Sequence, residues 1–409
     1  MGLFRNRQYS GEGSLTQLAM RRLLKDKFAV VSAAIVLLAV LIAILGYLIT
    51  PDQTPFANEQ ILELSCRKPG SSAKLLYLNR PLEHAAVWWP ARMIWGEKSN
   101  YRAVPILSYH FENEFIVVKA FTGRDLTDGP NLKYSLSDVL YGIPKSDVVA
   151  HNKIQIMNLH DSEGKLISKN VKELQQEVEQ KNLVVRHYWL GTDRYGRDML
   201  SQLMIGTRVS LSVGFISVAI SLLIGLFLGS IAGFFGGRTD ALITWLINVV
   251  WSIPTLLLVI AITFALGKGF WQVFIAVGLT MWVEVARVVR GQILSIREKE
   301  YVEAGKALGF RNPRIIFRHI LPNTLAPVIV ISAANFASAI LIEAGLSFLG
   351  IGVQPPMPSW GTMIKDNYGY IILDSAYLAI LPGLAIMIMV LAFMLIGNGF
   401  RDALDVKAT

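Results

Sequence analysis

A polar, basic segment at residues 300–322 lies between two long apolar runs and has the clearest potential for specific contacts. Most residues from Glu303 to Leu308 favour the helix, and Gly309 suits a helix stop because glycine reaches the left-handed conformation without steric cost. A helix over residues 301–308 would offer a partner protein the Glu303 carboxylate for hydrogen bonds or ion pairs. The alternative is an ordinary loop that is basic because it is cytoplasmic.

The sequence contains no motif for catalysis or phosphate binding. The Gly-Lys pairs that begin at Gly164, Gly267 and Gly305 are followed by neither Ser nor Thr, so none completes a Gly-x-x-x-x-Gly-Lys-Ser/Thr loop. No Gly-x-Ser-x-Gly elbow occurs, and no His, Cys or Glu cluster has metal-ligand spacing. We therefore expect that the chain is not an enzyme by itself and that it holds no cofactor or metal.

Composition indicates a multi-pass membrane protein. Of the 409 residues, 53% are hydrophobic and 17% are charged, whereas soluble domains carry about 25% charged residues. The net charge of +9 could suggest nucleic acid, but the basic residues cluster beside the apolar runs, as the positive-inside rule expects. The single cysteine, Cys66, excludes an intrachain disulfide.

The apolar runs predict an all-α polytopic protein with six transmembrane helices, since about 20 apolar residues span a bilayer. Proline at position 254 should kink the third span. Residues 1–27, the basic loop 290–323 and the tail 401–409 are expected in the cytoplasm. The predicted spans are 28–50, 209–235, 241–266, 270–289, 324–349 and 377–400.

Residues 51–190 have a different character, because none of their windows is long and apolar enough to span a membrane. Short β-branched runs at 115–118, 154–156 and 183–185 predict strands, a turn is expected at 161–164, and residues 171–182 predict a helix. We expect an inserted, strand-rich α+β domain on the extracytoplasmic side, between the first two spans. Two roles remain open: receiving a substrate-binding protein, or a structural cap.

Residues 191–208 are expected to form an interfacial helix before the second span. Thr192 or Asp193 could cap its start. Asp193 with Arg197, and Arg194 with Asp198, are four residues apart and could pair on such a helix.

Ionisable residues within the spans are candidates for function. Glu343 lies in the fifth span, where a buried hydrogen bond between helices and a place in the transport pathway are both open. Glu284, Arg287 and Arg290 are expected at the inner end of the fourth span, where their side chains can reach the interface. Gly225, Gly229 and Gly233 share one face of the second span and predict close helix packing.

Four patterns resemble the permease subunits of ABC importers, in the dipeptide/oligopeptide (and nickel) branch. The basic loop resembles the coupling loop of that family in its Glu-Ala-small start, the Gly that follows after three intervening residues, and its Leu-Pro end. Two positions depart from the broad pattern: Gly305 stands where Ala is common, and His319 where many branches carry Ile. The coupling residues are Tyr301, Glu303, Ala304, Gly305, Leu308, Gly309, Leu321 and Pro322; the other patterns are 190–198, 343–350 and 354–361.

The resemblance implies a type I ABC-importer permease fold in the bacterial inner membrane. It implies a second permease subunit, two ATPase subunits that bind ATP and Mg, and an extracytoplasmic substrate-binding protein. The coupling helix would dock on an ATPase and act as a lever on the spans, with Ala304 and Gly305 kept small for close contact. The resemblance says nothing about residues 51–190.

Three alternatives remain open, one within the importer family and two from other classes. An importer of nickel would use a related permease. An ion-coupled secondary transporter would need coupling charges near mid-membrane and often an internal repeat; only Glu343 qualifies, and no repeat is evident. A membrane-anchored binding module would need one span, which leaves the other spans and the patterned loop unexplained.

Overall fold

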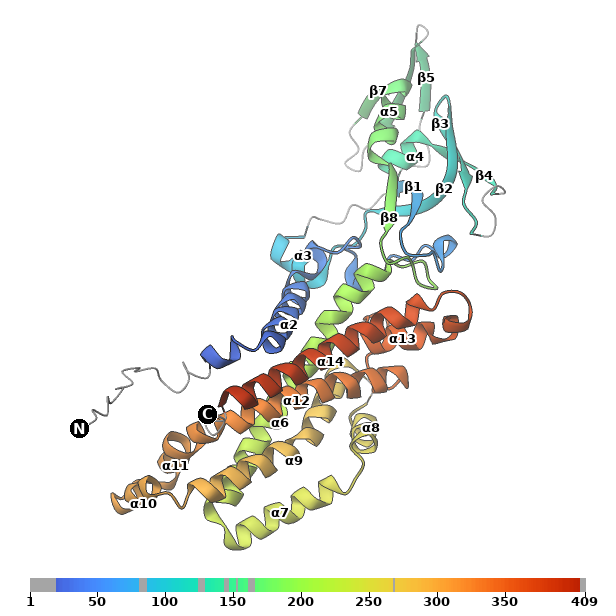
Figure 1. Cartoon of the computed structure of the whole chain (residues 1–409). Coiled ribbons are helices and arrows are strands. Elements are labelled where there is room, and N and C mark those ends of the chain that lie inside the picture. The colour runs from blue at the N-terminus through green and yellow to red at the C-terminus, as the bar shows by residue number, and fades with distance from the viewer. Residues whose placement is uncertain are drawn as a thin grey trace, which may run out of the picture.

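The computed structural model describes residues 20–80, 87–123, 129–142, 147–151, 154–160, 166–267 and 269–404. The expected turn at 161–164, most of the N-terminal segment and the last residues of the tail lie outside these ranges. The described chain has a helical part and a strand-rich part, which are joined at the start of the long helix α6 (Figure 1).

The helical part contains five helices long and apolar enough to cross a membrane, or up to six spans if one bent pair is counted as a span, among the described residues. The predicted number of six transmembrane helices lies within this range and stays a prediction. Shorter helices lie between them: α10 (Glu300–Ala307), α11 (Asn312–Ile315), a π-helical turn (Ile316–Ile320) and α13 (Trp360–Asn367). The long helices are α2 (Lys27–Leu45), α6 (Met199–Phe235), α9 (Phe270–Ile296), α12 (Leu321–Phe348) and α14 (Tyr377–Leu404).

The bent pair consists of α7 (Gly237–Trp251) and α8 (Thr255–Leu266), whose axes differ by 92°. The break falls at residues 252–254, and Pro254 caps the start of α8. Proline has no amide hydrogen and disfavours a helical residue before it, so the helix ends there. The predicted kink at Pro254 is confirmed as a sharp break.

The glycine stripe on α6 packs against α9. A Cβ added at Gly225 would lie 2.5 Å from Val285 Cβ, and one added at Gly229 would lie 2.6 Å from the Ala286 carbonyl oxygen. Backbones can approach this closely only where a side chain is absent. The predicted packing role of these glycines is confirmed.

The strand-rich part has a five-stranded antiparallel sheet of order β4-β3-β2-β1-β8. Helices α4 (Leu136–Tyr141) and α5 (Val171–Lys181) bury their apolar residues against it, with Leu136, Leu174 and Val178 fully covered. The strands of this sheet are β1 (Ser71–Asn79), β2 (Tyr101–Glu112), β3 (Phe115–Ala120), β4 (Asn131–Ser135) and β8 (Leu183–Tyr188).

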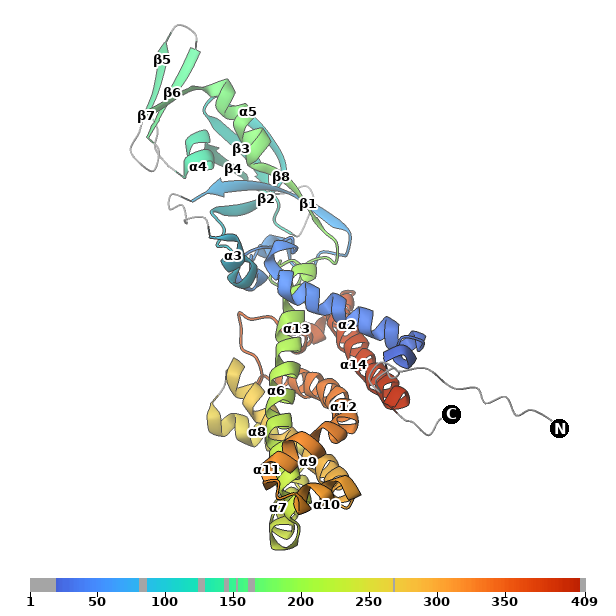
Figure 2. The ribbon, with the colours of Figure 1, turned by 90° about the vertical axis from the view of Figure 1, so that its left-hand side faces the viewer.

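A second sheet of three strands stands beyond the first: β5 (Asp147–His151), β6 (Ile154–His160) and β7 (Leu166–Asn170). The predicted strand runs correspond to β3, β6 and β8, and the predicted helix to α5. In both views the strand-rich part and α10 lie at opposite ends of α6 (Figures 1 and 2).

Near the C-terminal end of α2, the short helix α3 (Trp89–Trp95) and its N-cap residue present three exposed tryptophans, Trp88, Trp89 and Trp95. Arg208 of α6 ties the two helices together by donating hydrogen bonds to the carbonyl oxygens of Ala43 and Ile44 on α2 and of Met93 and Ile94 on α3. A cation stabilises the carbonyl end of a helix. Arg208 therefore satisfies the last turn of both helices at once.

Candidate functional site

The predicted coupling helix corresponds to α10, which presents one face to the protein and one to its surroundings. Val302 is 1% exposed and packs with Ile293 of α9 and Ile320 before α12. Glu303 and Ala304 are exposed, as are Tyr301 and Leu308. The helix is thus anchored to both neighbouring long helices while its outer face is open to a partner.

Gly309 ends α10 in a Schellman motif. Its φ is +74°, its amide donates to the Lys306 carbonyl (2.9 Å), and the Phe310 amide donates to the Gly305 carbonyl (3.1 Å). This pair of bonds satisfies two carbonyls at the helix end, and its geometry requires a left-handed conformation at residue 309. A Cβ at Gly309 would meet nothing within 4 Å, so the conformation, and not space, calls for glycine.

Gly305 corrects part of the coupling hypothesis. It was expected to stay small for contact with the ATPase, but it is buried and faces Phe310, whose ring lies 3.5 Å from an added Cβ. Phe310 in turn stacks on His319, with centroids 5.8 Å apart. Gly305 lies on the inner face because the helix turns by 100° per residue, which places it opposite Glu303 and close to Val302.

Leu321 and Pro322 form the first residues of α12, where proline is tolerated because the first helical amides have no partner. The Asn323 side-chain amide donates to the Tyr301 hydroxyl (3.2 Å). This bond connects α10 directly to α12.

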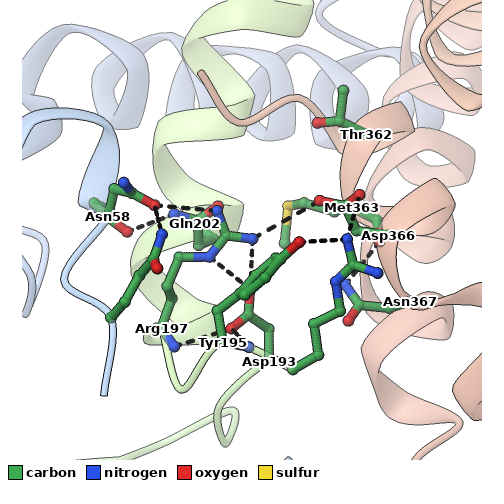
Figure 3. Close-up of polar contacts among 12 residues, drawn as sticks. Asn58, Asp193, Tyr195, Arg197, Gln202, Thr362, Met363, Asp366 and Asn367 are labelled. Atoms are coloured by element: carbon green, nitrogen blue, oxygen red, sulfur yellow. Dashed lines mark hydrogen bonds and ion pairs between the residues drawn. The ribbon is translucent and has the colours of Figure 1, made fainter. Parts of the chain in front are cut away.

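The segment around Asp193 and Arg197 forms a second polar site, at the other end of α6 (Figure 3). The Arg197 guanidinium donates to Asp193 Oδ2 (2.7 Å), lies 3.3 Å from Asn58 Oδ1, and lies 3.9 Å from Asp366 of α13. Arg194 in the same segment pairs with Asp366 (3.2 Å). The cluster fastens the start of α6 to α13 and to the segment after α2.

The prediction of an interfacial helix over 191–208 is wrong. Residues 191–198 form a turn, and α6 begins at Met199 and continues without interruption to Phe235. Gly191 and Gly196 have positive φ, and an added Cβ at either would clash with backbone of residues 61–69. This tight contact with a distant segment overrides local helix propensity.

The cap and one ion pair were also assigned incorrectly. Asp198, and neither Thr192 nor Asp193, caps α6 by accepting from the Ser201 amide (2.8 Å). Burial raises the pKa of the Asp198 carboxyl, and its hydrogen bonds with Ser201 oppose that shift. Arg194 pairs with Asp366 and not with Asp198, whereas the predicted Asp193–Arg197 pair exists within the turn.

Asp366, Asn58 and Gln202 belong to this site and were missed. The Gln202 amide donates to the carbonyl oxygens of Phe56 (2.9 Å) and Ala57 (2.5 Å). These contacts join positions far apart in the chain, and no local spacing signals them. The capping box at Ser359 and Thr362, which starts α13, was the one readable signal nearby.

Glu343 is fully buried between helices. Its Oε1 accepts from the Ser347 hydroxyl of α12 (2.7 Å), and its Oε2 lies 3.5 Å from the Ser210 hydroxyl of α6. Ser347 also accepts from the Val353 amide (3.1 Å), which fixes the loop after α12. This geometry matches a hydrogen bond that joins helices.

Glu284, Arg287 and Arg290 were all expected at the inner end of the fourth span, but Glu284 does not lie at the end of α9. The helix continues beyond residue 289 to Ile296, so Glu284 lies near its middle. Arg287 lies over the ring of Trp251 at 3.1 Å, and Arg290 pairs with Asp240 of α7 (2.5 Å). Among the described residues, no group of three His, Cys, Asp or Glu side chains could hold a metal ion.

Comparison with known proteins gives matches at both ends of the chain. Residues 225–409 match the family described as binding-protein-dependent transport system inner membrane component, and residues 14–64 match the N-terminal TM domain of oligopeptide transport permease C. Neither match includes residues 65–224, which contain the strand-rich part.

Individual relatives agree with the family match. The dipeptide transport system permease protein DppC of Alkalihalophilus pseudofirmus is 44% identical over 220 residues, which cover 54% of this chain and 72% of that protein. The oligopeptide transport system permease protein OppC of Bacillus subtilis is 40% identical over 222 residues, with the same coverage of 54% and 72%. An inward-facing structure of the MetNI methionine ABC transporter aligns with a TM-score of 0.43 at 20% identity, covering 50% of this chain and 97% of that one.

Both permease relatives are at least 40% identical to this chain, and the match covers 72% of each of them. The chain therefore belongs to the binding-protein-dependent transport system inner membrane components, in the branch of the dipeptide and oligopeptide permease C subunits.

Proposed function

We propose that this chain is a permease subunit of an ABC importer and that, with a second permease, it forms the pathway for peptides or similar small solutes. Separate ATPase subunits hydrolyse ATP with Mg, and a binding protein delivers the solute. The observation that carries the proposal is α10, which is fixed to α9 and α12 but exposes Glu303 and Leu308. Named relatives are permeases for dipeptides and oligopeptides, which favours peptide over nickel.

The same proposal places the two ends of the molecule. If α10 meets the ATPases in the cytoplasm, the strand-rich part at the opposite end of α6 is extracytoplasmic (Figure 1). The exposed tryptophans of α3 support this placement, because tryptophan is enriched where a membrane meets water. With six spans, both termini return to the cytoplasm.

A pull-down tests the proposal. The tagged chain is co-expressed with its partner subunits, recovered in mild detergent and assayed for ATP hydrolysis. We expect a second permease and ATPase subunits with the native chain, and their loss or uncoupling with Glu303→Lys, because a cation would replace the carboxylate on the open face of α10. Glu298→Lys is the matched control, since Glu298 is exposed but precedes α10.

Recovery of the chain alone, with no ATPase activity in either sample, would contradict the importer assignment. Equal recovery and equal transport with Glu303→Lys would instead contradict the role of α10 while leaving the importer assignment intact.

A further inference from the structure

A cavity of about 310 Å³ opens where the α7–α8 break faces α9 and α12. Its wall combines apolar side chains with the hydroxyls of Thr255, Thr280 and Ser338 and the carboxylate of Glu284. Small-molecule sites are concave, mostly apolar and carry a few polar groups, and they start at about 300 Å³. The cavity, which we call the break cavity, has this character.

Glu284 is the only acidic side chain in the wall of the break cavity. It is exposed, and it has no ion pair or hydrogen bond within the part of the chain that the structure describes. Arg287, one turn further along α9, lies over Trp251 instead of pairing with Glu284. Arg290 is already paired with Asp240. The carboxylate therefore faces the cavity without a counter-charge from its own subunit.

The depth of Glu284 makes an uncompensated charge costly. It lies about 20 Å along α9 from Phe270, at 1.5 Å per residue, and the hydrocarbon core of a bilayer is about 30 Å thick. An acidic side chain at such depth usually faces a water-filled space or a charged partner. An open, hydroxyl-lined cavity is such a space.

The backbone at residues 252–254 gives independent support. Non-helical backbone at membrane depth is tolerated where it is buried in protein or lines a water-filled cavity. Here Trp251, Ile253 and Thr255 are all exposed and all line the break cavity. The non-helical backbone at residues 252–254 and the Glu284 carboxylate thus both indicate that the break cavity is filled with water.

We propose that the break cavity is a peptide subsite of the transport pathway, in which the Glu284 carboxylate receives the α-ammonium group of the peptide. This inference rests on the proposed function and deepens it. The apolar wall, including Trp251, Leu258 and Leu341, would receive the first side chain of the peptide. Hydroxyls at Thr255 and Ser338 can bond any peptide backbone, which suits a carrier of varied sequences.

Two other occupants are possible in principle: a basic side chain of the second permease, or lipid. The Thr280 hydroxyl already donates to the Val277 carbonyl, but the hydroxyls of Thr255 and Ser338 disfavour lipid tails, because hydrocarbon offers them no hydrogen-bond partner. A basic side chain of the second permease would fill the cavity permanently, so it would exclude both reagents and peptides. That difference makes the occupants separable by experiment.

Thiol protection in the whole assembly tests the proposal. Cys66 is the single cysteine of the chain, so Cys66→Ser with Ser338→Cys places one thiol in the wall, and Thr255→Cys provides a second reporter. The complex in nanodiscs, without nucleotide, is treated with a charged maleimide in the presence of a free dipeptide or its N-acetylated form. Lys172→Cys, at an exposed position of α5 outside the membrane-spanning helices, is the control thiol outside the break cavity.

We expect the free dipeptide to slow modification of the cavity thiol and the N-acetylated dipeptide to have little effect. Glu284→Gln should raise the peptide concentration needed for protection about tenfold or more, since the negative charge that pairs with the ammonium group is lost and only a neutral acceptor remains. Glu298→Gln, beyond the end of α9, should leave protection unchanged.

Equal protection by both peptides, no protection, or a thiol that never reacts would overturn the proposal. Peptide uptake by the same complex is measured in parallel. Uptake without protection defeats only the break cavity as a subsite, whereas no uptake by an assembly that hydrolyses ATP defeats the proposed function itself.

Discussion

Ser71 and Tyr188 are paired neighbours on β1 and β8, so the five-stranded sheet begins and ends at one place. The segments just outside them are bonded as well, since the Gly70 amide donates to the Tyr188 carbonyl (3.0 Å). The sheet is therefore entered and left at neighbouring positions, although α3, between β1 and β2, also contacts the helical part through Arg208.

Because the ends of β1 and β8 are neighbours, a short linker can replace residues 71–188. Replacing residues 71–188 with a short glycine linker should preserve the contacts of Asp193 and Arg197, because they lie outside the excised range. If this part receives the binding protein, basal ATPase activity should persist while stimulation by the binding protein is lost. The measurement is ATPase activity of the complex in nanodiscs, with and without binding protein.

The excision also removes the Met93 and Ile94 carbonyls that bond Arg208, so the variant is first checked for monodispersity and for recovery of its partner subunits. A well-assembled variant that transports normally would rule out the receiving role and leave a structural cap.

The positive φ of Gly309 predicts different effects for two substitutions, although the surroundings have room for either side chain. Gly309→Val should abolish coupled transport, because a β-branched residue strongly disfavours positive φ. Gly309→Asn should retain most of it, since asparagine visits the left-handed region more readily. Transport per ATP hydrolysed is the quantity to measure. Full transport by the valine variant would show that the end of α10 is not part of the lever.

The two arginines of the 191–198 turn should differ in stability. Arg197 and Asp193 have side chains 10% and 2% exposed, so Arg197→Ala should destabilise the protein by about 3 kcal/mol by leaving a buried carboxylate unpaired. Arg194→Ala removes a pair at the more exposed Asp366 and should cost no more than about 1 kcal/mol. Thermal unfolding in detergent checks both, and equal shifts would contradict the assignment.

Glu343 offers a test between structure and pathway. Glu343→Gln keeps an acceptor for the Ser347 hydroxyl, so we expect transport to be retained. Glu343→Ala would leave buried hydroxyls unbonded and should lower stability by about 1–3 kcal/mol. Uptake and thermal stability are measured for both. A glutamine variant that folds normally but changes peptide preference would instead place Glu343 in the pathway.

Local patterns predicted much of the helical part. The break at Pro254, the glycine face of α6 and the end of α10 at Gly309 depend on neighbours within a few residues, and each could be read from the sequence. Strands β1, β2, β4, β5 and β7 were not predicted, because strand formation depends on pairing with neighbouring strands, which the pattern of a single strand does not reveal.

The site at Arg197 shows where such reasoning fails. A spacing of four suggested a helix, but contacts between Gly196 and backbone near Ile61 impose a turn. Asp366 and Asn58 join Arg197 only after the chain has folded. Similarly, the position of Gly305 in the coupling-loop pattern suggested contact with an ATPase subunit. Only the orientation of α10 in the folded chain shows that Gly305 faces Phe310 instead.

The bonds that hold α2 also set an order for biogenesis. The Asp52 amide, just after α2, bonds the Ser201 hydroxyl, and Arg208 bonds the carbonyls at the end of α2. These partners leave the ribosome only after the whole strand-rich part has been synthesised. The first helix is therefore synthesised before any of the groups on α6 that bond its C-terminal end and the residues just after it.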